Sequence, residues 1–201
     1  NRTESRCDEV VAAGAAKAST PAERASGKDI IITIVTDSPD VEEVLFGEDG
    51  AVSGAAERAR EGSLSLMVGG DSGLVDRARP IFDVVGENLY HMGDVGMGQA
   101  AKTCNNLMCL INVHVVEEAL RLARTAGIEE GRMLEVARAS SGDSWALCNV
   151  KNMRELAATH MKGAPDMSIF GRKDISLASK LGAKLGATVP ITDFVFEQTK
   201  K

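Results

Sequence analysis

One long helix sets the limits of any fold for this chain. We expect it to run from about Gly98 to Thr125, because this segment is apolar nearly all round in its middle and is charged only near its end. Gly127 then stands where a helix commonly ends on a glycine. The residues that follow this helix also have helical patterns, and shorter helices are expected at 130–139, 144–158, 172–185 and 192–200. The second half is therefore predicted to be all helical.

The first half alternates short β-type runs with helical ones. The run Asp29–Val35 is continuous and β-branched, which is typical of a strand buried on both faces of a parallel sheet. Further strands are expected at 63–68 and 88–91, and helices at 4–13, 41–45 and 72–84. This alternation indicates an α/β layer with a parallel sheet. The boundary is placed near Gly93, which gives domains at 1–92 and 93–201.

Composition excludes several classes of protein. The formal net charge is −6 and aromatic residues make up 3%, so a nucleic acid is not expected as a partner. The longest apolar run, Leu107–Val116, is too short to span a membrane and is interrupted by Asn112 and His114. The cysteines show no metal-binding spacing, and the two within the long helix suggest small core side chains in a reducing compartment, the cytoplasm.

The beginning of the long helix carries an unusual polar group. Lys102 and Asn106 are spaced i, i+4 and so project from one face, with Asn105 beside them. A lysine and amides close together in an apolar helix need polar partners, and a bound substrate could supply them. The alternative is that Lys102 reaches the surface and the asparagines only cap a helix. We disfavour it because the segment after Asn106 continues apolar.

Two of the motifs in the second half resemble those of the β-hydroxyacid dehydrogenases. The catalytic signature of that family is a glycine, a lysine four residues later and an Asn-Asn pair, matched by Gly98, Lys102, Asn105 and Asn106. The family also opens a late helix with Lys-Asp, matched by Lys173-Asp174.

Two further motifs in the first half support the same resemblance. The substrate loop of the family carries Ser-Gly, here Ser53-Gly54, before a Gly-(Thr/Ser)-Leu strand, here Gly62-Ser63-Leu64. Members that use NADP have Asn-Arg-Thr at the end of the second strand, and this sequence begins Asn1-Arg2-Thr3.

The resemblance implies a fold and an activity. The fold would be a Rossmann-like parallel-sheet N-terminal domain, incomplete here, joined by the long helix to an all-α C-terminal domain. The activity would be NADP-dependent, with NAD possible, and would interconvert a short-chain β-hydroxyacid and its semialdehyde by hydride transfer. Lys102 would be the general acid/base. A homodimer or homotetramer is expected.

The resemblance also assigns binding residues. A small carboxylate-bearing substrate would be held by Ser53, Gly54, Asn105 and Asn106. The cofactor would be held by Asn1, Arg2, Thr3, Val35 and Lys173. No metal site is expected.

Two parts of the family pattern are missing from the sequence. One is the first strand with its glycine-rich G-x-G-x-x-G turn, and the other is a segment near Ala51-Val52. We expect that the sequence joins segments of a longer polypeptide rather than representing a truncated gene product. Gly96–Ala101 satisfies G-x-G-x-x-A, but the acidic residues twenty positions on lie in the same helix, so we interpret it as a false match.

Three alternatives stay open at this point. The chain could be a non-catalytic dimerisation or ligand-binding module that has lost the phosphate-binding half. Lys173 could be a solvated lysine in the first turn of a helix. Asp166 stands where many relatives have an aromatic residue, and it is either a change of substrate contact or a helix N-cap.

Overall fold

The computed structural model describes residues 8–16, 50–53, 61–160 and 171–200 of a chain that divides into two compact units, 1–48 and 49–201. In the first unit it describes helix α1 (Asp8–Ala12). The helix ends at Ala12, and Gly14 follows two residues later with φ +102°, which agrees with the predicted helix stop at this glycine. The strand predicted at 29–35 and the helix predicted at 41–45 lie outside the described residues.

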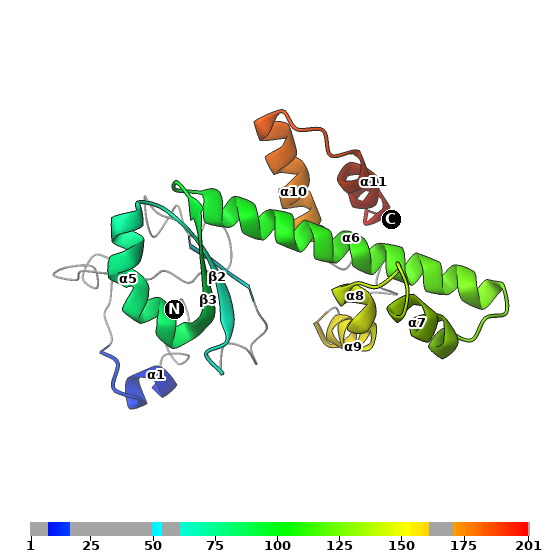
Figure 1. The fold of residues 1–201 in the computed structure, drawn as a ribbon, viewed down its shortest axis with the longest axis horizontal. Helices are drawn as coiled ribbons and strands as arrows, with labels where there is room; N and C mark the ends of the chain where they lie inside the picture. The colour runs from blue at the N-terminus through cyan, green and yellow to red at the C-terminus, as the bar shows by residue number, and fades with distance from the viewer. Residues whose placement is uncertain (1–7, 17–49, 54–60, 161–170, 201) are drawn as a thin grey trace. The chain divides into compact units, whose positions relative to one another are not determined.

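The second unit begins with a sheet in the order β1-β2-β3. Its strands are β1 (Gly50–Ser53), β2 (Leu64–Gly69) and β3 (Gly86–Gly93). The parallel pairing of β2 with β3 confirms the predicted parallel sheet, and helix α5 (Ser72–Val85) makes the crossover between them (Figure 1). Strand β1 runs antiparallel to β2, with Ser53 opposite Ser65, and this pairing was not predicted.

The core of this layer forms between the sheet and α5. Leu66 and Val68 of β2 are buried with Val75 of α5. Partly buried apolar side chains pack against them, namely Leu64, Phe82 and Leu89. Asp71 fixes the start of α5, because its side chain accepts a hydrogen bond of 3.0 Å from the backbone N–H of Leu74.

The first turn of the long helix α6 (Met97–Thr125) lies in very close contact with the sheet. A Cβ on Gly98 would lie 2.4 Å from the backbone oxygen of Met67, and one on Gly69 would lie 2.4 Å from that of Asp94. Only glycine fits at these two positions, so the first turn of α6 is fixed against β2. At the other end Gly127 has φ +84° and Ile128 N–H donates to the oxygen of Ala123, which confirms the predicted helix stop.

Five shorter helices complete the described chain. They are α7 (Glu130–Arg138), α8 (Trp145–Cys148), α9 (Val150–His160), α10 (Arg172–Leu185) and α11 (Pro190–Gln198). The prediction of one helix over 144–158 was wrong. The structure divides this segment at Asn149 into α8 and α9. The side-chain amide of Asn149 donates to the backbone oxygen of Trp145 at the end of α8.

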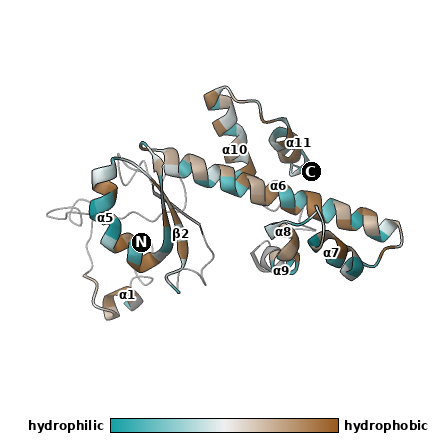
Figure 2. Ribbon diagram, in the orientation of Figure 1, coloured by the Kyte–Doolittle hydropathy of each residue, from teal (hydrophilic) through white to brown (hydrophobic). Residues whose placement is uncertain are grey.

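Two groups of helices pack against α6 (Figure 1). Val116 and Leu120 of α6 are buried with residues of α7, α8 and α9, namely Leu134, Ala137, Leu147 and Val150. Leu110 is buried instead with Ile175 of α10 and Val195 of α11. Hydrophobic residues recur along the whole of α6, as expected for a helix with neighbours along its length (Figure 2). Among the described residues, no helix is long and apolar enough to cross a membrane.

Arg154 of α9 joins three helices electrostatically. Its Nε donates to Glu117 Oε1 of α6 at 2.7 Å, and its Nη1 donates to Glu130 Oε1 of α7 at 2.7 Å. Glu130 also pairs with Arg124. Hydrogen bonds from Arg154 hold the pKa of Glu130 below its usual value. The side chains of Arg154, Glu117 and Glu130 are each less than one-third exposed, so water screens their charges only in part.

Candidate functional site

Lys102 lies in the second turn of α6, four residues after Gly98. Because Gly98 is fixed against β2, the position of Lys102 relative to the sheet is fixed as well. The side chain is half-buried. The structure therefore favours the interpretation of Lys102 as a partly enclosed cation over that of a lysine in bulk water.

The surroundings of Lys102 act on its pKa in opposite directions. Burial lowers the pKa, because a charged amine loses water contact, and this effect is the larger. The negative charge of Asp174 acts against it and raises the pKa, and Cys109 has the same sign of effect. The net result is a pKa below that of an ordinary lysine, which brings the amine closer to the range in which it can exchange protons near neutral pH.

Asn106 and Asp174 connect α6 to α10. The Asn106 side chain amide donates to Asp174 Oδ1 at 3.4 Å, in a partly buried contact. Asp174 lies in the first turn of α10, and its neighbour Ile175 is fully buried against Leu110. This apolar anchor holds the carboxylate beside the polar face of α6. Lys102, Asn106 and Asp174 thus form one group, which we call the α6–α10 polar group.

Asp174 is the member of this group that the residue pattern did not identify as a site residue. It was visible only as the second residue of the Lys-Asp motif. Its contact with Asn106 joins positions 68 apart in sequence, so nothing local could reveal it.

Two of the other described candidates are sequence neighbours of this group and differ in exposure. Asn105 is half-buried on α6, and Lys173 is exposed in the first turn of α10, directly before Asp174. Ser53 is the last residue of β1, so it ends a strand. Five of the predicted residues lie outside the described residues, as does Asp166; they are Asn1, Arg2, Thr3, Val35 and Gly54.

The glycines at the start of α6 have a packing function. Gly98 makes the close contact with β2, and Gly96 has φ +88° at the turn before the helix. Glu117, which would be the carboxylate partner in a dinucleotide fingerprint, is bound by Arg154. Both observations agree with the interpretation of Gly96–Ala101 as a false match. Across residues 8–16, 50–53, 61–160 and 171–200 we find no group of histidine, cysteine or acidic side chains arranged for a metal ion.

The polar group can perform acid–base chemistry on a carbonyl or hydroxyl oxygen. A lysine with a lowered pKa can give a proton to such an oxygen or take one from it. An amide one helical turn away can hydrogen-bond the same ligand and restrict its position. The exposed cation at Lys173 suits an anionic ligand nearby.

Two family models match the chain and together cover nearly all of it. The model described as NAD-binding of NADP-dependent 3-hydroxyisobutyrate dehydrogenase matches residues 96–201. The model described as the NAD binding domain of 6-phosphogluconate dehydrogenase matches residues 1–52 and 49–93.

Individual proteins show the same similarity. The chain is 30% identical to the 2-hydroxy-3-oxopropionate reductase of Escherichia coli, over 92% of this chain and 76% of that protein. It is 38% identical to the 3-hydroxyisobutyrate dehydrogenase of Pseudomonas aeruginosa, over 84% of this chain and 61% of that protein. The solved structure of Mycobacterium tuberculosis 3-hydroxyisobutyrate dehydrogenase with L-serine has a TM-score of 0.65 and 29% identity. That match covers 76% of this chain and 54% of the solved chain, so the chain spans about half of that relative.

Proposed function

Since this chain belongs to the β-hydroxyacid dehydrogenase family, we propose that it is an NADP-dependent oxidoreductase that interconverts a short-chain β-hydroxyacid and its semialdehyde. The observation that carries the proposal is the α6–α10 polar group. In this group a half-buried lysine of lowered pKa lies beside an amide and a carboxylate. Such a lysine can transfer a proton to or from a substrate oxygen.

Lys102 is the proton donor in the direction of reduction. The carbonyl carbon of the semialdehyde receives a hydride, and the ammonium of Lys102 gives one proton to the carbonyl oxygen, which becomes the hydroxyl. In the direction of oxidation the neutral amine takes that proton back. The nicotinamide, when bound, supplies or accepts the hydride.

Asp174 sets the protonation of Lys102 and the position of Asn106. Its negative charge raises the pKa of Lys102, offsets part of the effect of burial and so favours the protonated amine. Its Oδ1 accepts the Asn106 amide and thereby limits the orientation of that side chain. Asn106 and Asn105 then contact the substrate, and Ser53 and Gly54 receive its carboxylate.

The cofactor assignment rests on charge. Lys173 is an exposed cation one residue from Asp174, which suits an anionic dinucleotide. Arg2 within Asn1-Arg2-Thr3 would bind a 2′-phosphate, and Asn1 stands where members that prefer NAD would carry a carboxylate. Val35, the last residue of the strand that the sequence predicts at 29–35, would contact the cofactor. We therefore propose NADP, with NAD as the alternative.

The broader organisation is proposed on the same basis. Residues 1–92 form the dinucleotide-binding domain and residues 93–201 the helical domain. The protein works in the cytoplasm as a homodimer or homotetramer, with a small carboxylate-bearing substrate. No described feature favours the alternative of a non-catalytic binding module.

Steady-state assays across a panel of short semialdehydes, each with NADPH and with NADH, test the activity. We expect turnover of at least one semialdehyde and a higher kcat/KM with NADPH. Lys102→Ala is expected to abolish turnover while NADPH affinity, measured by fluorescence titration, stays nearly unchanged. Turnover close to that of the wild type, or a loss of activity that is fully explained by a loss of NADPH affinity, would contradict the assigned role of Lys102.

A further inference from the structure

Two turns at one edge of the sheet meet under the first turn of α6. One follows β2 and contains Gly69 and Gly70, and the other joins β3 to α6 and begins at Gly93. The backbone N–H of Gly70 donates to the oxygen of Gly93 at 2.8 Å. A Cβ on Gly69 would lie 3.0 Å from the backbone nitrogen of Gly98, so the backbone of α6 rests directly on the turn after β2. We call these four glycines the glycine junction.

The glycine junction does not hold its own conformation. Gly70 has φ +141° and Gly93 has φ +116°, both in the region that favours glycine. Glycine has the greatest backbone freedom of all residues, and it has no side chain that could anchor a turn. A restraint on the two turns therefore has to come from other residues.

His91, near the end of β3, provides such a restraint. Its Nε2 donates to the backbone oxygen of Gly70 at 2.8 Å. A carbonyl oxygen only accepts hydrogen bonds, so Nε2 carries a proton in this contact. The bond joins residues 21 positions apart and ties the end of β3 to the turn after β2. Leu89, two residues earlier and on the same face of β3, packs against the core of the layer and holds the strand from which His91 extends.

The bond of His91 has little weight in the stability of the whole fold. The histidine is exposed, so water can take the place of the imidazole as a donor to Gly70. The net gain from exchanging one such donor for another is small. The effect of the bond is local, because it restricts the turn on which Gly98 rests. Its place in the fold is better explained by positioning than by stability.

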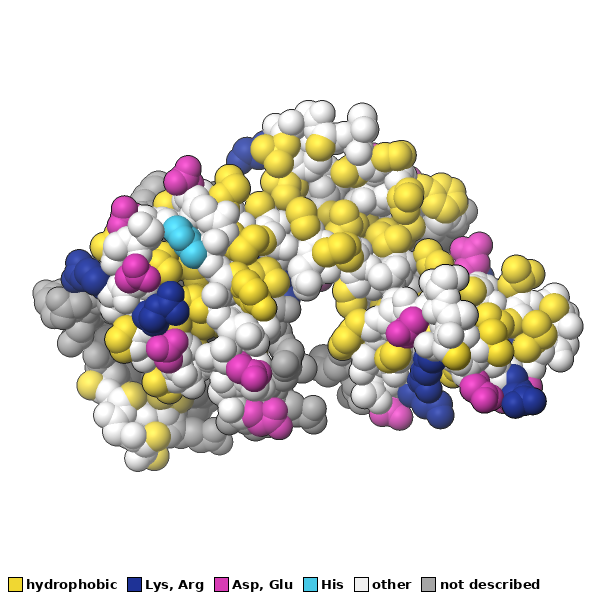
Figure 3. All heavy atoms as spheres, viewed as in Figure 1, with side chains coloured by type: hydrophobic (Ala, Val, Ile, Leu, Met, Phe, Trp, Pro, Cys, Tyr) yellow, Lys and Arg dark blue, Asp and Glu magenta, His cyan; other side chains and the backbone are white. Residues whose placement is uncertain are grey.

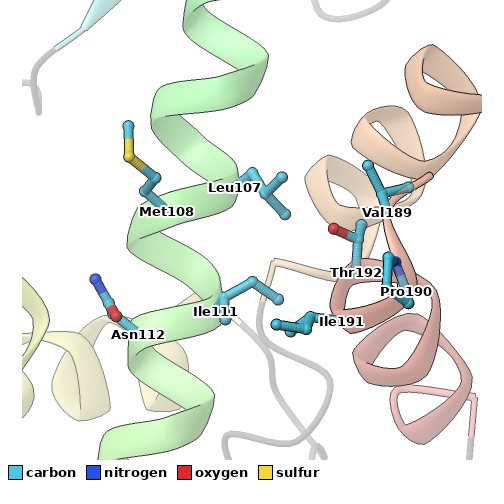
Figure 4. A pocket seen from close by; sticks show the side chains of 8 residues that line it. All are labelled: Leu107, Met108, Ile111, Asn112, Val189, Pro190, Ile191 and Thr192. Carbon is cyan, nitrogen blue, oxygen red and sulfur yellow. The ribbon is translucent and has the colours of Figure 1, made fainter. Parts of the chain in front are cut away.

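Farther along, α6 is held by side chains rather than by its backbone. On one side it borders a groove of about 440 Å³, where Leu107 and Ile111 point toward α11 (Figure 4). Figure 3 shows hydrophobic side chains gathered over α6, α10 and α11 on the face that it draws. Side chains can repack around a small shift of a helix, whereas the backbone contact at Gly98 leaves no room for one. The glycine junction therefore sets where the first two turns of α6, and with them Lys102, lie.

We propose that His91 is a positioning residue for proton transfer by Lys102, and that it acts through the glycine junction. The inference rests on the proposed function, in which the Lys102 amine exchanges a proton with the substrate oxygen. Lys102 lies one helical turn after Gly98, so a displaced first turn displaces the amine. Proton transfer needs its two heavy atoms within about 2.6–3.2 Å, and a misplacement of about 1 Å can slow a reaction roughly hundredfold. Loss of the His91 bond is therefore expected to slow the chemistry of a protein that stays folded.

Steady-state kinetics of His91 variants test the proposal. His91→Ala is expected to lower kcat about tenfold and to leave the KM values for NADPH and the semialdehyde within about twofold of the wild type. His91→Gln should recover most of the loss, because its amide nitrogen is as many bonds from Cβ as Nε2 is and can donate to Gly70. His91→Asn carries the same amide on a shorter side chain, so it should resemble His91→Ala. Tyr90→Ala is the matched control, because Tyr90 is 51% exposed and its side chain lies on the opposite face of β3.

The outcomes separate this inference from the proposed function. An active wild type with an equally active His91→Ala variant would overturn the inference and leave the proposed function intact. A loss of kcat that His91→Gln does not recover would also overturn it, since the loss would not depend on the hydrogen bond. A wild type that turns over no semialdehyde would instead refute the proposed function, and the inference with it.

Hydrogen–deuterium exchange follows the glycine junction without any assay of activity. In His91→Ala the backbone amides of residues 96–104 are expected to exchange about threefold faster or more, while those of α7 exchange at the wild-type rate. Urea unfolding should give nearly the same midpoint as for the wild type. Unchanged exchange across residues 96–104 would overturn the proposal, because His91 would then not act through the start of α6.

Discussion

Replacing Arg154 by methionine tests how the helices of the second half are held together. Methionine keeps much of the aliphatic stem and removes the guanidinium, so it isolates the charge from the packing. Arg154 donates to Glu117 and to Glu130 and is 32% exposed, while these carboxylates are 15% and 26% exposed. Removing one partner of a fully buried ion pair costs about 3–5 kcal/mol. At this partial exposure we expect a loss of about 2–3 kcal/mol in the free energy of unfolding.

Urea unfolding followed by circular dichroism measures that loss. Arg132→Met is the matched control, because Arg132 and Glu135 form an i, i+3 pair in which both side chains are at least 70% exposed. Such a pair contributes about 0.5 kcal/mol or less. Adding Glu117→Gln to Arg154→Met should recover part of the loss, since it removes an uncompensated charge.

The difference between wild type and Arg154→Met should also depend on pH. The pKa of Glu130 is lowered in the folded protein, so its contribution to stability is present above the pKa of the unfolded chain. That contribution is lost as the pH falls through the lowered, folded-state pKa. Equal stability of Arg154→Met and Arg132→Met at neutral pH would refute the reasoning.

Two other substitutions test the site and its support. Asp174→Asn removes the negative charge that raises the pKa of Lys102, so the amine should lose its proton at lower pH. The decline of the reduction rate at high pH should then begin at lower pH than in the wild type. A pH–rate profile with an unchanged high-pH decline would contradict the role of Asp174. Gly98→Ala would put a Cβ 2.4 Å from the backbone oxygen of Met67, so it should lower the free energy of unfolding, measured with urea, by about 1–3 kcal/mol. An unchanged midpoint of urea unfolding would show that α6 can move away from β2 without a loss of stability.

Local signals in the sequence predicted most element positions in the second unit. The extent of α6 follows from its apolar run and from Gly127, and both ends agree with the structure. Helix α10 begins and ends where its pattern predicts, at Arg172 and Leu185. The division at Asn149 was not predicted, because no glycine or proline marks it and the apolar pattern continues across it.

Contacts between distant segments could not be predicted in this way. The antiparallel pairing of β1 with β2 depends on which strands meet, and four residues from Gly50 to Ser53 carry too short a pattern to indicate it. The bond between Asn106 and Asp174 and the ion pairs of Arg154 likewise join separate helices. The resemblance to a known family singled out Lys102 as a candidate, whereas the effect of the Asp174 carboxylate on its pKa became visible only in the folded chain.

The central claim is that the amine of Lys102 transfers the proton, and chemical rescue tests it most directly. Lys102→Ala is assayed for reduction of a semialdehyde by NADPH with and without added methylamine or ethylamine, at several pH values. We predict that the amines restore turnover by at least tenfold in this variant, with a saturating concentration dependence, and leave the wild type unchanged. Wild-type turnover by Lys102→Ala without any amine, or an NADPH-binding variant that no amine restores, would contradict the account.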